Sequence, residues 1–129
     1  MTIINPTKKV LKKCTYDILI GSLGVKGDKH SKSELISYIN FFQLKSLAEI
    51  PVSVKDMTIT NGNYLEAGYI IHIVNYPKLD MLSCSTFYTF ANDLAIYLLD
   101  RLNQRRVLIE VNDLCGSDTI MYENQDFID

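Results

Sequence analysis

The feature that most constrains the fold of this chain is the adjacent pair Asn61 and Gly62. The pair lies between residues 52–60 and residues 63–75, two segments rich in β-branched and aromatic side chains. Asn-Gly readily takes positive φ at both central positions of a type I′ turn, a common connection between antiparallel strands. The sequence therefore predicts a β-hairpin near the middle of the chain, with Asn61 and Gly62 as its turn.

A two-residue turn also sets which residues of the hairpin lie opposite one another. With this turn, Tyr64 is expected opposite Ile59, and the same register places Glu66 opposite Met57. Side chains alternate along a strand, so the second strand presents two sets. The more continuous apolar set, expected beneath the helices, is Leu65, Ala67, Tyr69, Ile71 and Ile73. The mixed set, expected on the open face of the sheet, is Tyr64, Glu66, Gly68, Ile70, His72 and Val74.

The segments on either side of the hairpin complete a two-layer pattern. Residues 14–22 and 106–111 have the composition of strands. Residues 31–34, Ser-Lys-Ser-Glu, form a capping box that predicts a helix ending near Leu47, and residues 86–103 predict a second helix. The order strand, helix, hairpin, helix, strand predicts an α+β, ferredoxin-like βαββαβ sandwich. Right-handed crossovers then place both helices on one face of a four-stranded antiparallel sheet.

In both expected helices, apolar residues recur at three- and four-residue spacing, which identifies the side that faces the sheet. In the first helix they are Leu35, Ile36, Ile39 and Phe42. In the second helix they are Phe87, Phe90, Ala91, Leu94 and Leu98.

The 129 residues are enough for one domain. We expect a single ferredoxin-like domain at residues 14–112, a basic arm at residues 1–13 and an acidic tail at residues 113–129. The tail is either loose or adds an edge strand from Thr119 to Tyr122. The opposite charges of arm and tail fit two solvated ends, and they also fit head-to-tail attraction between subunits.

Charge and composition exclude several classes of function. The formal net charge is −2, whereas a general nucleic-acid binder needs a basic surface. No apolar run approaches the roughly 20 residues that cross a bilayer, and no secretory signal is recognisable, so we expect a cytoplasmic protein. The three cysteines include no CxxC pair and are expected as reduced thiols, and the two histidines lack ligand spacing. No metal site is therefore expected.

The first candidate site is the pair Tyr64 and Glu66. The two residues are neighbours on one strand face, where a carboxylate beside a phenol can act as acid, base or anchor for a cation. The same residues also fit a surface charge at a hairpin end and a cross-strand packing partner.

The second candidate site is the loop formed by Gly21, Ser22, Leu23 and Gly24. Glycines allow close approach, and the following helix has a positive end, so the loop could offer backbone N–H groups to an anion. An ordinary flexible loop fits the same residues. His72 fits a packed or interface histidine better than a catalytic one.

The open face of the expected sheet is partly apolar. Ile70 and Val74 would form an exposed patch there, and such patches mark interaction surfaces. We expect another subunit to cover this face, with Tyr64 and Glu66 at the rim.

Residues 62–67, Gly-Asn-Tyr-Leu-Glu-Ala, resemble the G-x-Y-x-E-A stretch of phage-encoded S-adenosylmethionine lyases, long described as S-adenosylmethionine hydrolases. The first strand with its small-residue loop and the last strand, residues 107–111, are similar as well. The resemblance implies a ferredoxin-like fold, trimers with sites between subunits, and a Tyr and a Glu in each site. Those roles fall to Tyr64 and Glu66. A second acidic residue that some members use has no counterpart in residues 69–75.

The resemblance also implies an activity: cleavage of S-adenosylmethionine, the small-molecule substrate, to methylthioadenosine and homoserine lactone, with no cofactor and no metal. The substrate carboxylate attacks the γ-carbon, so the protein supplies positioning. Glu66 would hold the amino or sulfonium region, Tyr64 would orient Glu66, and the loop from Gly21 to Gly24 would bind the substrate. In a phage, this activity serves evasion of methylation-dependent restriction.

Two other hypotheses remain open on the sequence. One is a non-catalytic ferredoxin-like module that binds a small ligand or a protein through its open face. The other is a phage or plasmid inhibitor that docks on a host factor through its acidic tail. Neither would release methylthioadenosine.

Overall fold

The computed structural model describes residues 3–8, 14–46, 50–74, 84–113 and 116–127. Its strands are β1 (Thr15–Gly21), β2 (Val52–Asn61), β3 (Tyr64–Val74), β4 (Arg106–Asp113) and β5 (Gly116–Glu123). Its helices are α1 (Lys32–Lys45), α2 (Cys84–Arg101) and a short 3-10 helix (Gln125–Phe127).

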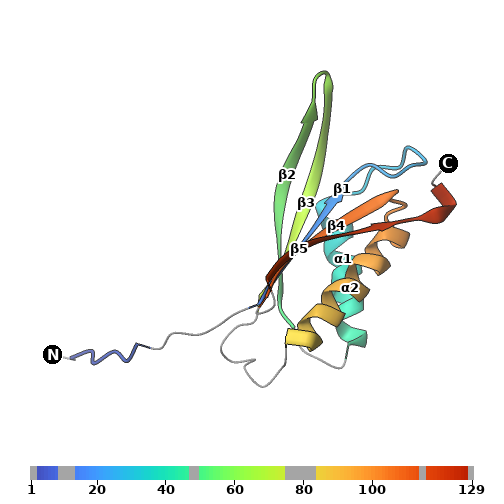
Figure 1. The fold of residues 1–129 in the computed structure, drawn as a ribbon. Helices are drawn as coiled ribbons and strands as arrows, with labels where there is room; N and C mark the ends of the chain where they lie inside the picture. Colours follow the sequence, from blue (N-terminus) through green and yellow to red (C-terminus); the bar gives the residue numbers. More distant parts are fainter. Residues whose placement is uncertain (1–2, 9–13, 47–49, 75–83, 114–115, 128–129) are drawn as a thin grey trace.

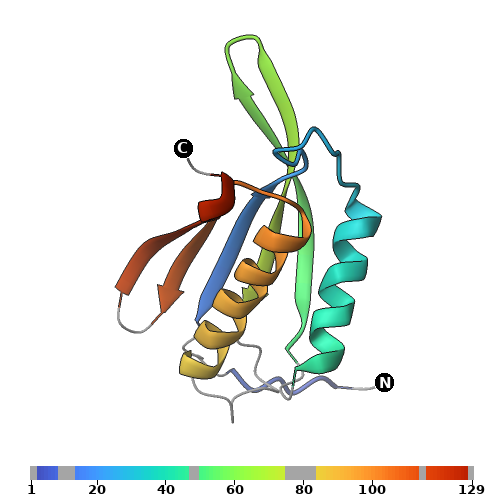
Figure 2. The same cartoon turned by 90° about the vertical axis from the view of Figure 1, so that its right-hand side faces the viewer.

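The five strands form one antiparallel sheet in the order β2-β3-β1-β4-β5. Both α1 and α2 lie on one face of this sheet (Figures 1 and 2), and no described helix covers the other face. The first four strands have the order of a ferredoxin-like unit. The α+β class is therefore confirmed, whereas the expected four-stranded sheet is wrong, because a fifth strand extends it.

That fifth strand, β5, pairs with β4 along its whole length, from Asp113 opposite Gly116 to Arg106 opposite Glu123. The sequence left this segment open between a loose tail and a short edge strand. Pairing with β4 forms the strand, and Ile120 adds to its stability by packing against the core on the helix side. A loose tail would leave that apolar surface in water.

The start of α1 uses only half of the predicted capping box. The Ser31 hydroxyl accepts a hydrogen bond from the Glu34 N–H at 3.1 Å, as expected. The Glu34 carboxylate, however, lies 3.0 Å from Nδ1 of His30 instead of reaching back to the Ser31 backbone. His30 therefore engages the Glu34 carboxylate that the capping box would have directed to the Ser31 N–H.

The apolar stripes of the helices are largely as expected. In α1, Leu35 and Ile39 are buried and Phe42 is partly buried against the core. Ile36 is exposed, contrary to expectation, because one helical residue beyond Leu35 is a rotation of about 100° away from the sheet. In α2 all five expected residues are buried: Phe87, Phe90, Ala91, Leu94 and Leu98. They meet a row of buried isoleucines across the sheet, namely Ile71, Ile18 and Ile109.

The predicted hairpin forms, but its turn is displaced by one residue. Gly62 and Asn63 occupy the turn, and Asn61 pairs with Tyr64. Gly62 has φ 62° and Asn63 has negative φ, the pattern of a type II′ turn with glycine at its first central position. Consequently, Glu66 lies opposite Ile59, and the two expected pairings are wrong. The pairing shifts by two positions, so every side chain stays on its expected face.

The two halves of β3 differ in burial. Tyr69, Ile71 and Ile73 are buried beneath the helices, as expected. Leu65, on the same face, is 72% exposed, and Ala67 is exposed as well. The expectation fails for these two because the hairpin end projects beyond the helical layer, as Figure 1 shows.

Cys14 is buried and disulfide-bonded. The expectation of reduced thiols is therefore wrong for this residue. It rested on the missing CxxC spacing, and spacing along a chain does not show which cysteines a fold brings together.

Candidate functional site

Tyr64 and Glu66 meet on the open face of the sheet, near the projecting end of β3. The Tyr64 hydroxyl donates a hydrogen bond of 2.5 Å to Oε1 of Glu66. Tyr64 is 48% exposed, and Glu66 is half-buried. The hydrogen bond to Glu66 is the main cause that raises the pKa of Tyr64, so the phenol remains a donor at neutral pH. One carboxylate oxygen of Glu66 is thus engaged, and the other is directed elsewhere.

Oε2 of Glu66 rests on Gly21, the last residue of β1. A Cβ built on Gly21 would overlap Oε2 and lie 3.2 Å from Cδ of Glu66. Gly21 pairs with Gly68 across the β1–β3 ladder, so neither position places a side chain on the open sheet face. The missing side chain at Gly21 makes the space into which the carboxylate folds.

Gln104, two residues before β4, reaches the same place and was not found from the sequence. Its side chain is 6% exposed, and its Oε1 would lie 3.3 Å from a Cβ on Gly21. Its Nε2 donates to the carbonyl of Leu23 at 3.1 Å and to that of Leu102 at 3.2 Å. Gln104 therefore links the predicted loop to the end of α2 and lies beside Glu66.

The end of α2 positions Gln104 through a Schellman motif. Asn103 adopts φ 50°, and its N–H donates to the carbonyl of Asp100 at 3.1 Å. The N–H of Gln104 donates to the carbonyl of Leu99 at 3.0 Å. Asparagine is one of the residues that favours this left-handed position, so the cap was recognisable in the sequence.

Backbone hydrogen bonds hold the predicted loop in place, both within the loop and to neighbouring segments. Ser22 N–H donates to the carbonyl of Ala67, and Gly24 N–H donates to that of Asp28. The N–H groups of Val25 and Gly27 donate to Asn103 and Gly24. These four donors are engaged, so they do not form a cradle for an anion. The loop instead presents Gly21 beneath Glu66.

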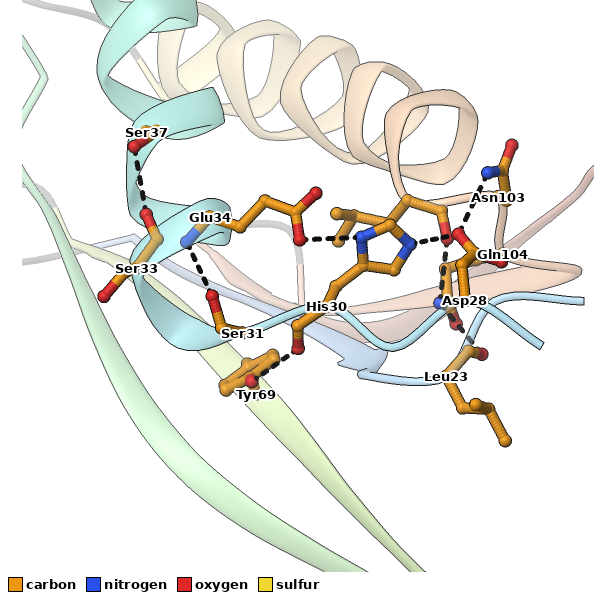
Figure 3. A network of polar contacts seen from close by, with 11 residues as sticks. Leu23, Asp28, His30, Ser31, Ser33, Glu34, Ser37, Tyr69, Asn103 and Gln104 are labelled. Carbon is orange, nitrogen blue, oxygen red and sulfur yellow. Dashed lines mark hydrogen bonds and ion pairs between the residues drawn. The ribbon is translucent and has the colours of Figure 1, made fainter. Parts of the chain in front are cut away.

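A buried histidine, His30, links this loop to α1, and its partner Asp28 links the loop to Asn103 just after α2, as Figure 3 shows. Nε2 of His30 lies 2.5 Å from Oδ2 of Asp28, and Nδ1 lies 3.0 Å from Oε2 of Glu34. Only a ring protonated on both nitrogens can donate to both carboxylates. Asn103 Nδ2 donates to the same oxygen of Asp28 at 3.0 Å, and the His30 carbonyl accepts from the Tyr69 hydroxyl at 2.9 Å. The Asn103 amide is the largest cause that lowers the pKa of Asp28.

The middle of the open sheet face carries a row of partly exposed apolar residues. Cross-strand partners place Ile70, Leu19, Leu108 and Met121 side by side on β3, β1, β4 and β5. Leu108 and Met121 are exposed, and Ile70 is half-buried. Val74, expected in the same exposed patch, is buried instead. The row runs across the strands from β3 to the edge strand β5.

His72 does not join the Tyr64 and Glu66 pair. Its Nδ1 lies 2.5 Å from Oδ1 of Asp17, its cross-strand neighbour on β1. Six residues separate it from Glu66, roughly 20 Å along a strand. The structure thus places His72 as a partner of Asp17.

A separate groove of about 660 Å³ lies between α1 and α2, on the helical side of the molecule. Aromatic rings form much of its wall, including Phe42, Phe90 and Tyr97. Tyr64, Glu66 and the loop from Gly21 to Gly24 take no part in its lining.

No described group of three or more His, Cys, Asp or Glu side chains is arranged to hold a metal ion. No described helix is long and apolar enough to cross a membrane.

The described parts define a five-stranded α+β sandwich with a tyrosine–glutamate pair at one end of an open sheet face. No protein-family model matches the chain, and no curated protein matches it by sequence. Two solved structures of phage SAM (S-adenosylmethionine) lyase match it over nearly the whole length. The apo lyase has a TM-score of 0.69 at 15% identity and covers 94% of this chain and 98% of its own. The lyase in complex with S-methyl-5′-thioadenosine has a TM-score of 0.68 at 14% identity and covers 97% and 100%.

At this level of identity, the match shows the fold. The resemblance to phage S-adenosylmethionine lyases, first indicated by residues 62–67, is therefore confirmed as a likeness of structure. The roles of Tyr64, Glu66 and the loop stay predictions.

Proposed function

We propose that this protein is an S-adenosylmethionine lyase, with its site at Tyr64 and Glu66. The observation that carries the proposal is the full-length likeness to a phage SAM lyase, one structure of which holds methylthioadenosine. The Tyr64–Glu66 hydrogen bond supports it, because a positioned carboxylate is the feature that a cationic substrate needs.

The proposed reaction is an internal displacement. A carboxylate oxygen of the substrate forms a bond to its own γ-carbon, while the bond between that carbon and sulfur breaks. The electron pair of that bond returns to the sulfonium sulfur, which leaves as the neutral thioether of methylthioadenosine. Carboxylate and sulfonium charges cancel, so homoserine lactone forms without a water, a metal or a cofactor.

The protein's contribution is to hold the substrate chain folded, so that the attacking oxygen meets the γ-carbon. Glu66 supplies a negative charge near the amino and sulfonium end of the substrate. Tyr64 fixes the orientation of that carboxylate through Oε1. The loop residues Gly21, Ser22, Leu23 and Gly24 form a wall beside it, with Gly21 leaving room for Glu66.

A second copy of the chain completes the proposed site. The apolar row on the open face ends in two exposed residues, Leu108 and Met121, which another subunit would remove from water. We propose a homo-oligomer, a trimer by the family resemblance, with the site at the boundary between copies. Its proposed setting is the cytoplasm of an infected host, where loss of S-adenosylmethionine opposes methylation-dependent restriction.

Incubation of the purified protein with S-adenosylmethionine tests the proposal. Chromatography should show methylthioadenosine and homoserine lactone forming in equal amounts. Glu66→Gln should abolish release without changing the oligomer. Glu110→Gln, an exposed carboxylate on the same sheet face of β4, is the matched control and should retain activity.

Each contrary outcome removes a defined part of the proposal. Unchanged turnover in Glu66→Gln would remove the site assignment but keep the activity. No product from the wild-type protein would remove the activity. A rise in melting temperature with ligand but without product would instead support a non-catalytic binding module.

A further inference from the structure

Two acceptor oxygens from different elements converge above Gly21. Oε2 of Glu66 and Oε1 of Gln104 both lie within 3.3 Å of the position that a Gly21 side chain would fill. Neither oxygen can donate a hydrogen bond while Glu66 is ionised. Two acceptors that lie close together repel each other and lack hydrogen bonds. A donor group between them lowers this unfavourable free energy.

The geometry fixes which end of the Gln104 amide faces Glu66. Both N–H bonds of Nε2 point to backbone carbonyls, those of Leu23 and Leu102. The amide carbonyl is therefore the end directed at Gly21. The Schellman motif at Asn103 fixes the Gln104 backbone, so the oxygen is held from both sides.

The same argument applies to Glu66. Its Oε1 already accepts the Tyr64 hydroxyl, which leaves Oε2 as the oxygen that faces Gln104. A formal negative charge and an amide dipole then point at one small space. A group with several N–H donors and a positive charge fits this space best.

We propose that Glu66 and Gln104 together form a subsite for a primary ammonium group, in which Gln104 accepts one N–H and Glu66 another. The inference rests on the proposed lyase function and extends it by assigning the amino group of the substrate to this place. A sulfonium carries no N–H bond, so it cannot satisfy Oε1 of Gln104. Gln104 is thus a residue for substrate positioning and selectivity.

Two nucleosides that differ only in the ammonium group test the inference by equilibrium binding. One is S-adenosylhomocysteine, and the other is 5′-deoxy-5′-(3-carboxypropylthio)adenosine, in which hydrogen replaces the amino group. The wild-type protein should bind the first at least about tenfold more tightly. Gln104→Met should reduce that preference at least about fivefold, with little change in binding of the deaminated analogue.

The matched control is Gln43→Met, the same substitution at a glutamine near the end of α1. Nε2 of Gln43 donates to the carbonyl of Ile50 at 3.0 Å, so this variant also loses a side-chain amide but leaves Gln104 unchanged. The preference for the ammonium ligand should be unchanged in this variant. If Gln104→Met does not fold, the side-chain amide resonance of Gln104 in the wild-type protein replaces it. That resonance should shift with S-adenosylhomocysteine and not with its analogue.

Failure of this inference and failure of the proposed function are distinguishable. Equal binding of the two ligands by the wild-type protein, or an unchanged preference in Gln104→Met, would overturn the subsite while turnover of S-adenosylmethionine persists. No turnover with a Gln104-dependent preference would overturn the lyase and keep the subsite. Binding of neither ligand would overturn the subsite, and product formation from S-adenosylmethionine would still decide the lyase.

Discussion

The two halves of β3 obey the same alternation but serve different purposes. From Tyr69 to Val74 the strand lies beneath the helices, and one face is fully buried. From Tyr64 to Gly68 it projects beyond them, and Leu65 on the corresponding face is exposed. The comparison shows that a strand pattern predicts which side chains share a face, whereas the second layer decides which of them become core.

One half of β3 therefore contributes to the stability of the fold, and the other half carries the candidate site. The buried half contributes apolar burial to the fold. The projecting half carries Tyr64 and Glu66, and its partners at Gly21 and Gln104 come from the ends of other elements. Substitutions in the two halves should therefore have separable effects.

The largest expected effect is in the buried half. Ile71→Ala removes a fully buried side chain from the central isoleucine row and should lower the free energy of unfolding by about 2–5 kcal/mol. Leu65→Ala, six residues earlier on the same face, is the control and should change it by less than about 0.5 kcal/mol. Urea denaturation measures both. Similar losses in the two variants would contradict the division of the strand.

The second effect should appear in activity and not in stability. Gly21→Ala adds a methyl group where the Glu66 carboxylate lies, and the carboxylate must move because the end of a side chain yields before the backbone does. Turnover should fall by about 100-fold, the loss expected from a misplacement near 1 Å. The melting temperature should stay within a few degrees of wild type.

Gly24, in the same loop, provides a control for the Gly21→Ala result. Gly24→Ala would displace Asp28, which anchors the loop to Asn103. It should lower the melting temperature more than Gly21→Ala does. Full activity in Gly21→Ala would show that the position of Glu66 above Gly21 is not needed.

The smallest effect is a pH dependence of the loop that supports the projecting half. The Asn103 amide is the first cause that lowers the pKa of Asp28, so the folded chain holds the Asp28 proton less tightly than the unfolded chain does. This carboxylate therefore contributes stability above its usual pKa of about 4, and the contribution is lost as the pH falls through the lowered value.

Thermal unfolding between neutral and acid pH checks this prediction. Asn103→Gly should melt below the wild-type protein at neutral pH, and the gap should narrow as the pH falls below about 4. A gap that stays constant with pH would show that the Asn103 contact does not act through the charge of Asp28.

The sequence was most informative where local chemistry decides the outcome. The hairpin, the helical stripes and the sharing of a face by Tyr64 and Glu66 followed from Gly62 and from simple periodicity. The exact pairing did not follow, because glycine can occupy either central turn position and each choice gives a different register. Asn61 opposite Tyr64 is the consequence.

Long-range proximity was not visible in the same way. Gln104 and Gly21 are far apart in the chain, and nothing in either residue's local sequence indicates that they meet. The edge strand β5 was left open for a related reason: its alternation is weak, and only pairing with β4 decides its state. Asn103 carried a local signal, because asparagine favours the left-handed position after a helix, but it was expected as the last residue of the helix.

The motif that ends α2 has a consequence for how the chain can vary in length. Asn103 ends the helix, and Gln104 follows it directly. The position of the Gln104 side-chain carbonyl beside Glu66 therefore depends on the final turn of α2. One residue inserted into that turn would rotate the amide by about 100° and carry it away from the site. Insertions are thus tolerated more readily at the hairpin tip than between α2 and β4.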